Sequence, residues 1–238
     1  MNTTTTRFLG RLPQLITFFF SLTLVNGFRV LSDTYHWTTQ PSFKFNDPGQ
    51  YLIAVSFVVT LVWIVTAWLG YSLLIERVPY TLGFGRFFFD VARFSLMFAL
   101  LNFTFLAGQK NGYQIYLFTL AIFHFMMVAW YFDQERQTTD ATRQKMYGGD
   151  VRSHGFRALT YLVLGLVFYF GVATRSTGTG TDSLRYAILI VTFVLMTVWN
   201  VRRLADLRAY ARGEDAPATV EPAPAVAEPG DGVPVARA

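Results

Sequence analysis

Long uninterrupted apolar stretches make up most of this chain, and polar residues gather in short segments between them. Six stretches approach or exceed the ~20 helical residues that cross a hydrocarbon core of ~30 Å. Alternating barrel strands do not fit, because the stretches are too long and too continuous. The pattern therefore predicts an all-α, polytopic membrane protein built as a bundle of six transmembrane helices. The predicted spans are 12–31, 51–75, 86–107, 114–132, 156–174 and 184–201.

Composition agrees with a chain whose main solvent is lipid. Hydrophobic residues make up 53% of the 238 residues and charged residues only 15%, against about 25% charged in a typical soluble domain. Cysteine is absent, which excludes disulfides, iron–sulfur clusters, thiolate zinc sites and cysteine nucleophiles.

Basic residues are distributed unevenly between the two ends of the predicted spans. Fourteen of the 20 Lys and Arg residues fall on the side that holds both termini and five on the other, with Arg93 inside a span. Cytoplasmic loops carry such an excess, so we expect both termini in the cytoplasm. Arg7 and Arg11 precede the first span, and no A-x-A-like cleavage site follows it, which favours a retained signal anchor.

The chain changes character after Arg212. Residues 213–238 are rich in Pro, Ala and Glu and contain no aromatic residue, so they cannot bury enough apolar area to offset chain entropy. We expect residues 1–212 to form the transmembrane domain and 213–238 a disordered cytoplasmic tail. In the inner loop 133–155, we expect a polar continuation of the fourth span that breaks at the glycine pair 148–149.

Three charged residues lie at the start of the third span, in "RFFFDVARFS". Arg86, Asp90 and Arg93 are spaced i, i+4, i+7, so they share one helix face and Asp90 can reach either arginine. Two interpretations remain open. The arginines can snorkel to the cytoplasmic headgroups, or the three groups can face a water-filled cavity inside the bundle.

Two further polar side chains lie deep within spans. Asn102 is suited to a contact between helices, or to a solute path. His124, near the middle of the fourth span, suits a structural hydrogen bond or a proton-carrying role. The other histidines, His36 and His154, are expected in loops on opposite sides, so a transmembrane histidine pair for haem is not expected. We predict no cofactor and no metal site.

The outer end of the first span carries a second polar group. Arg29 and Asp33 are spaced i, i+4, with Asn26 about one turn earlier. We expect an interfacial salt bridge here, with a site at the outer mouth as the lesser alternative.

The function is inferred from these polar groups and from the motifs that are absent. The sequence lacks G-x-S-x-G, H-E-x-x-H and G-x-x-x-x-G-K-[ST]. The leading hypothesis is a small channel or transporter that moves an ion or small solute. Arg93 and Asp90 would form a cytoplasmic-side charge gate or anion contact, and His124 a contact near the midplane. The predicted path residues, in the third and fourth helices, are Arg86, Asp90, Arg93, Asn102 and His124.

Two other classes of function stay open. The protein can be a non-catalytic scaffold or a subunit of a larger membrane complex, and a membrane-embedded enzyme is the least favoured alternative. The expected partners are the lipid bilayer and anionic lipids on the cytoplasmic side, with further copies of the chain or other membrane proteins left open. Nucleic acid is not expected, because the basic residues follow the membrane topology.

Overall fold

The protein is described by a computed structural model over residues 12–35, 48–77, 84–109, 112–137, 139, 141–174 and 179–211. Over these residues it is all-helical, which confirms the all-α part of the prediction. The predicted tail, residues 213–238, lies outside the described residues. The α-helices are α2 (Leu12–Tyr35), α3 (Pro48–Arg77), α4 (Phe84–Asn102), α5 (Tyr113–Gln137), α6 (Ala141–Phe168) and α7 (Thr179–Ala211). A 3₁₀ segment, η1 (Phe103–Gly108), extends α4, and a π-helical turn, η2 (Tyr169–Ala173), extends α6.

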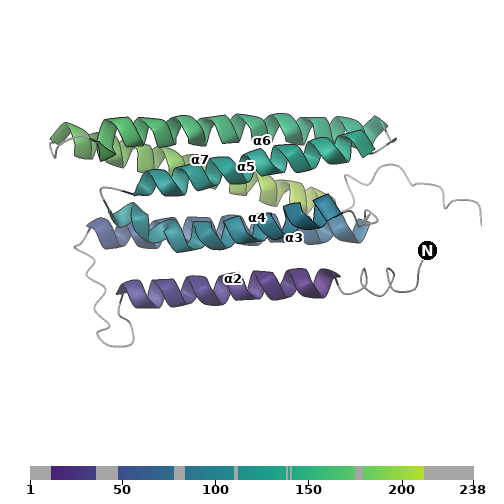
Figure 1. The fold of residues 1–238 in the computed structure, drawn as a ribbon, viewed down its shortest axis with the longest axis horizontal. Helices are drawn as coiled ribbons and strands as arrows, with labels where there is room; N and C mark the ends of the chain where they lie inside the picture. Colours follow the sequence, from purple (N-terminus) through teal and green to yellow (C-terminus); the bar gives the residue numbers. More distant parts are fainter. Residues whose placement is uncertain are drawn as a thin grey trace, which may run out of the picture.

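Five of these helices are long and apolar enough to cross a membrane, as a multi-pass protein requires. The helix α2 covers the first predicted span and lies alongside the others (Figure 1), but it is not one of the five. Large apolar side chains such as Phe156, Phe170 and Val201 are exposed on the outside of the bundle, where a lipid solvent would cover them. The five candidate spans are Tyr51–Ser72, Phe88–Gly108, Tyr113–Gln137, Tyr147–Ala173 and Gly180–Ala205.

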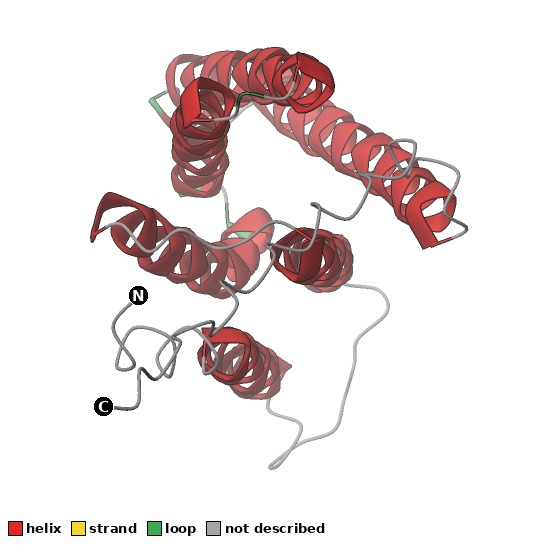
Figure 2. Cartoon of the chain, turned by 90° about the vertical axis from the view of Figure 1, so that its right-hand side faces the viewer, coloured by secondary structure: helices red, strands yellow, loops and turns green. Residues whose placement is uncertain are grey.

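The helices pack side by side with their long axes roughly parallel (Figure 1). Figure 2 views the bundle nearly along these axes and shows α2 at its edge, where it packs against α3 and α4. Helix α5 is central: it contacts α4, η1 and, most extensively, α6. Gly165 on α6 allows α5 and α6 to lie this close, because a Cβ at Gly165 would lie 2.6 Å from Cε1 of Phe118 on α5.

Buried hydroxyl groups join three helices in the half of the bundle where α5 begins. Oγ1 of Thr60 on α3 donates to the carbonyl of Ser56 and lies 2.7 Å from Oη of Tyr116 on α5. Tyr116 also lies 3.3 Å from the sulfur of Met196 on α7, and its ring stacks on that of Tyr113. Both tyrosines are fully buried, so this half of the bundle is tightly filled.

The prediction of a helix break at the glycine pair 148–149 was wrong. Both glycines lie inside α6, which begins at Ala141. Each glycine in a helix costs about 1 kcal/mol relative to alanine, but packing overrides this preference here. Tyr147 is buried, and a Cβ at Gly148 would lie 3.2 Å from Oε1 of Glu135 on α5. The polar half of α6 therefore continues as a helix along α5.

Candidate functional site

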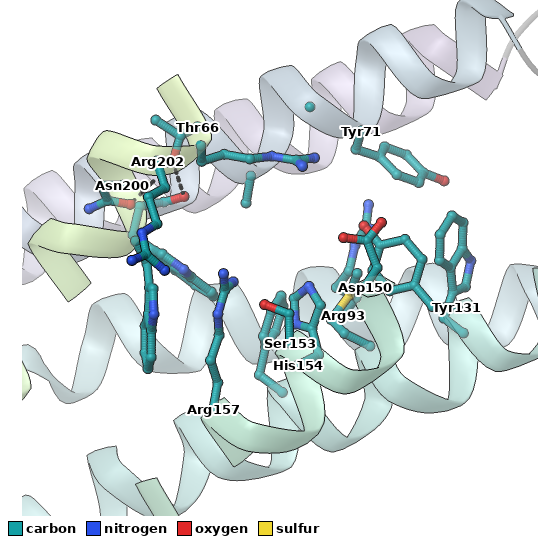
Figure 3. Close-up of a pocket in the computed structure, with 18 of the residues that line it drawn as sticks. Thr66, Tyr71, Arg93, Tyr131, Asp150, Ser153, His154, Arg157, Asn200 and Arg202 are labelled. Carbon is teal, nitrogen blue, oxygen red and sulfur yellow. Dashed lines mark hydrogen bonds between the residues drawn. The ribbon is translucent and has the colours of Figure 1, made fainter. Parts of the chain in front are cut away.

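A polar cavity of about 360 Å³ lies inside the bundle, toward the end where α3, α5 and α7 terminate. Figure 3 shows side chains that line it. Helices that are consecutive in the chain run in opposite directions, so late residues of α3, α5 and α7 meet early or middle residues of α4 and α6. The lining residues fall within 63–71, 93–97, 123–131, 150–157 and 199–205. Five helices thus contribute to one site.

The charged groups around this cavity are mostly arginines. Four arginines and a single aspartate, Asp150, are among the lining residues, which is a formal excess of three positive charges. Neutral polar groups are added by Ser153 and by Thr66, whose hydroxyl lies 3.4 Å from Oδ1 of Asn200. The arginines are Arg93, Arg157, Arg202 and Arg203.

Arg93, on α4, is almost fully buried, with only 5% of its surface exposed. Its guanidinium carbon lies 3.7 Å from the centroid of the Tyr71 ring. This cation–π contact covers one face of the guanidinium and leaves the in-plane N–H groups unused. Nε and Nη2 have no hydrogen-bond partner among the described residues, although such buried donors are normally paired.

Two other arginines reach the same cavity from different helices. Arg157 extends from α6 into it (Figure 3), with its guanidinium carbon 4.8 Å from the centroid of the Trp199 ring. Its Nε also lacks a partner within the described part of the chain. Arg203 lies against α3 at Gly70, where an added Cβ would come within 2.9 Å of the guanidinium carbon. Gly70 therefore makes room for Arg203.

The structure contradicts one prediction directly: His154 does not lie in a loop, and a histidine pair exists. His154 is in α6, and its Nδ1 lies 2.9 Å from Nδ1 of His124 on α5. One of these nitrogens donates and the other accepts, so at least one ring carries no proton on Nδ1. Tyr161 stacks on His124 and Tyr131 on His154. His154 is among the residues that line the cavity, whereas His124, a predicted path residue, is not. Within the described residues, no group of three or more potential ligands could hold a metal ion.

The charged residues predicted in the third span have different surroundings. Arg93 lines the cavity, whereas Asp90 is equally buried but is not among the lining residues. Arg93 makes no ion pair with Asp90 or with any other described residue, so the contact that the spacing of Asp90 and Arg93 allows is not formed. Arg86 belongs to α4, but its side chain lies outside those described.

Asn102 and Asn26 are brought together, and neither is among the residues that line the cavity. Nδ2 of Asn26 on α2 donates to Oδ1 of Asn102 on α4 at 2.8 Å, and Nδ2 of Asn102 donates to the carbonyl of Phe98. The pair therefore joins two helices. One turn further along α2, Arg29 and Asp33 form an exposed ion pair of 3.7 Å, a type that contributes little to stability.

The Asn26–Asn102 contact predicts a measurable coupling between α2 and α4. In a double-mutant cycle of Asn26→Leu and Asn102→Leu, we expect a coupling free energy of about 0.6–2 kcal/mol, the range for hydrogen bonds between membrane helices. Unfolding in mixed micelles measures it. The same cycle with Ser95→Ala in place of Asn102→Leu is the control, because Ser95 bonds only within α4. Equal coupling in the two cycles would contradict the assignment.

Sequence reasoning missed most of the arginine cavity. Arg157, Arg202 and Arg203 were interpreted only as topology signals. One available signal was their spacing: Asp150, His154 and Arg157 lie at i, i+4, i+7, the same spacing that drew attention to the third span. Once α6 is recognised as a helix from Ala141, this spacing places the three groups on one face.

The cavity thus combines buried arginines with free donors, aromatic rings that pack on these arginines, and His154, one member of the histidine pair. Such an arrangement suits the binding of a negatively charged group. No protein-family model matches the chain, and comparisons with curated proteins and with solved structures find no match either.

Proposed function

We propose that this protein is a small channel or transporter that carries an ion or small solute across the membrane. The observation that carries the proposal is the arginine-lined cavity of about 360 Å³ within a bundle whose outer surface is apolar. Ionisable groups in membrane spans are costly and usually face a solute path or a wet cavity. The predicted third and fourth spans correspond to α4 and α5. The proposed path includes these two helices and also α3, α6 and α7.

The proposed topology has six spans and both termini in the cytoplasm. Helix α2 has 24 residues, a length of about 36 Å at 1.5 Å per residue, which is sufficient to cross the hydrocarbon core. The cavity then opens toward the cytoplasm, because it lies at the end of the bundle where Arg202 and Arg203 are found and where the excess of basic residues predicts the inner side.

A transporter that changes conformation fits this architecture better than an open pore. The cavity lining ends before the buried layer that contains Thr60, Tyr113 and Tyr116. Residues in this layer bond and stack with each other across α3, α5 and α7. A solute bound in the cavity would therefore cross only if this layer rearranged, as in alternating access.

Flux measurements with the purified full chain in liposomes test the proposal. We expect uptake of radiolabelled anions such as phosphate, sulfate or carboxylates to exceed the leak of empty liposomes. The matched control is the same protein with the cavity blocked by Ser153→Trp, which keeps the membrane helices but fills the space. Uptake equal to the leak for a broad panel of anions, cations and neutral solutes would refute transport and favour a scaffold or subunit.

A further inference from the structure

We propose that the cavity binds a dianionic oxyanion of the phosphate class, held by the guanidinium groups of Arg93, Arg157 and Arg203. As the solute of a transporter, this oxyanion rests on the proposed function. Its binding is argued from the geometry of the cavity alone. The ligand is inorganic phosphate or the phosphate group of a monoester.

The side chains that line the cavity leave most of its positive charge uncompensated. Among the lining residues, Asp150 is the one carboxylate against four arginines. Removing a cation from water is unfavourable even after the protein relaxes. Arg93 bears this cost without an ion pair to any described residue. An anion with two charges would balance most of the excess, whereas a monoanion would leave more of it and a cation would add to it.

Hydrogen-bond donors without a partner among the described residues lie at the cavity on two helices. Aromatic rings cover faces of the guanidinium groups of Arg93 and Arg157 and leave their edges available. Nε and Nη2 of Arg93 and Nε of Arg157 are buried donors with no partner in the described chain. Phosphate oxygens accept paired hydrogen bonds from the planar fork of arginine. Donors on two helices thus already line one space.

Gly70 on α3 makes room for the guanidinium of Arg203 at the cavity wall. Even one added carbon at this position would overlap the Arg203 guanidinium. The glycine lets a cation from α7 lie flat against α3 at the cavity wall, so guanidinium groups from α4, α6 and α7 surround one volume. A space of about 360 Å³ also has room for an organic group attached to the phosphate, next to rings such as Trp63 and Trp130.

The same chemistry can come from two sources, a water-soluble phosphate or the headgroup of a phospholipid with a terminal phosphate. The two differ in how they reach the site. Soluble phosphate enters through the polar end of the bundle. A lipid headgroup enters from the bilayer and leaves its acyl chains outside. The experiment below therefore has a detergent arm and a bilayer arm.

Binding is measured by isothermal titration of the purified full chain with inorganic phosphate at constant ionic strength, with chloride as the reference anion. We expect saturable binding to the wild type and a loss of about 10- to 100-fold in affinity for Arg93→Gln, the usual effect of removing a charged hydrogen-bond partner. Arg136→Gln is the matched control. It removes an exposed arginine on α5 that is not among the lining residues, and its affinity should stay within about twofold of the wild type.

In the bilayer arm, the protein is placed in nanodiscs containing either phosphatidic acid or only phosphatidylcholine. Competition between phosphatidic acid and added phosphate would identify a lipid headgroup as the occupant, and equal binding in both discs would identify soluble phosphate. If Arg93→Gln does not fold, Arg93→Lys tests the same point, because it keeps the charge but loses the fork. We expect an intermediate affinity for this variant.

Absence of saturable phosphate binding by the folded wild type in both arms would overturn the inference, as would an equal loss in the Arg93 and Arg136 variants. Binding without flux would refute the proposed transport and leave the site intact. Flux of another solute without phosphate binding would refute the site and leave transport intact.

Discussion

Replacing Arg157 by glutamate is expected to lower phosphate affinity and anion flux by about 100-fold or more. A 100-fold loss corresponds to about 2.8 kcal/mol. The substitution removes a guanidinium that reaches into the cavity and adds a carboxylate on the helix face that already carries Asp150. The formal excess of three positive charges falls by two, so the cavity loses most of its attraction for a dianion.

Arg152→Glu provides a matched control on the same helix. Arg152 is exposed and is not among the lining residues, but its substitution changes the net charge of the protein by the same amount. Affinity and flux should stay within about twofold of the wild type, because exposed charges are screened by salt. Titration calorimetry and liposome uptake, both made at 0.15 M salt, measure the two variants. If Arg152→Glu lowered affinity as much as Arg157→Glu, the effect would come from overall charge and not from the cavity.

The helical fold was predictable from sequence because lipid imposes a simple rule. Backbone groups in a hydrocarbon core must bond within the segment, so a long apolar stretch has few alternatives to a helix. The same rule fails where the chain leaves the lipid. Hydropathy located the apolar half of α6 but assigned Gly148 and His154 to a loop, since nothing in a polar segment shows that a neighbouring helix will support it. Contacts with α5 extend α6 to Ala141.

The candidate site was predictable only one helix at a time. Spacing within a helix drew attention to Arg93, with headgroups and a cavity both left open as its surroundings, and position in the middle of a span drew attention to His124. Neither identified their neighbours, because those depend on how each helix is rotated and which helix packs beside it. Arg93 meets the Tyr71 ring on α3 instead of Asp90 on its own helix. His124 meets His154 on α6.

Asn26 and Asn102 also show that the sequence does not identify which helix a polar side chain contacts. The sequence left Asn102 with two alternatives, a contact between helices or a solute path, and placed Asn26 near an interfacial salt bridge with an outer site as the lesser alternative. Their direct hydrogen bond agrees with a contact between helices and identifies the partner, which neither position reveals alone. Polar residues within spans are thus a reliable sign that protein lies nearby, but their partner decides whether the role is a packing contact or a binding site.

Gly165→Leu is expected to have the largest effect on stability, lowering the free energy of unfolding by about 1–3 kcal/mol or more, the cost of adding atoms to a filled interior. Helices α5 and α6 make the most extensive contact in the described bundle, and even the first added carbon would meet the Phe118 ring at 2.6 Å. The leucine side chain would have to separate the two helices, and this would also pull His124 away from His154.

Gly149→Leu tests whether the loss comes from this contact or from the amino-acid change itself. Gly149 lies on the same helix, and a Cβ added there meets nothing within 4 Å. Removing a glycine from a helix usually gains about 0.5–1 kcal/mol, so this variant should match or exceed the wild type when both are unfolded by SDS in mixed micelles. Because the two substitutions are chemically identical, equal losses would mean that α6 tolerates no leucine at either glycine. The close packing of α5 and α6 would then not explain the result.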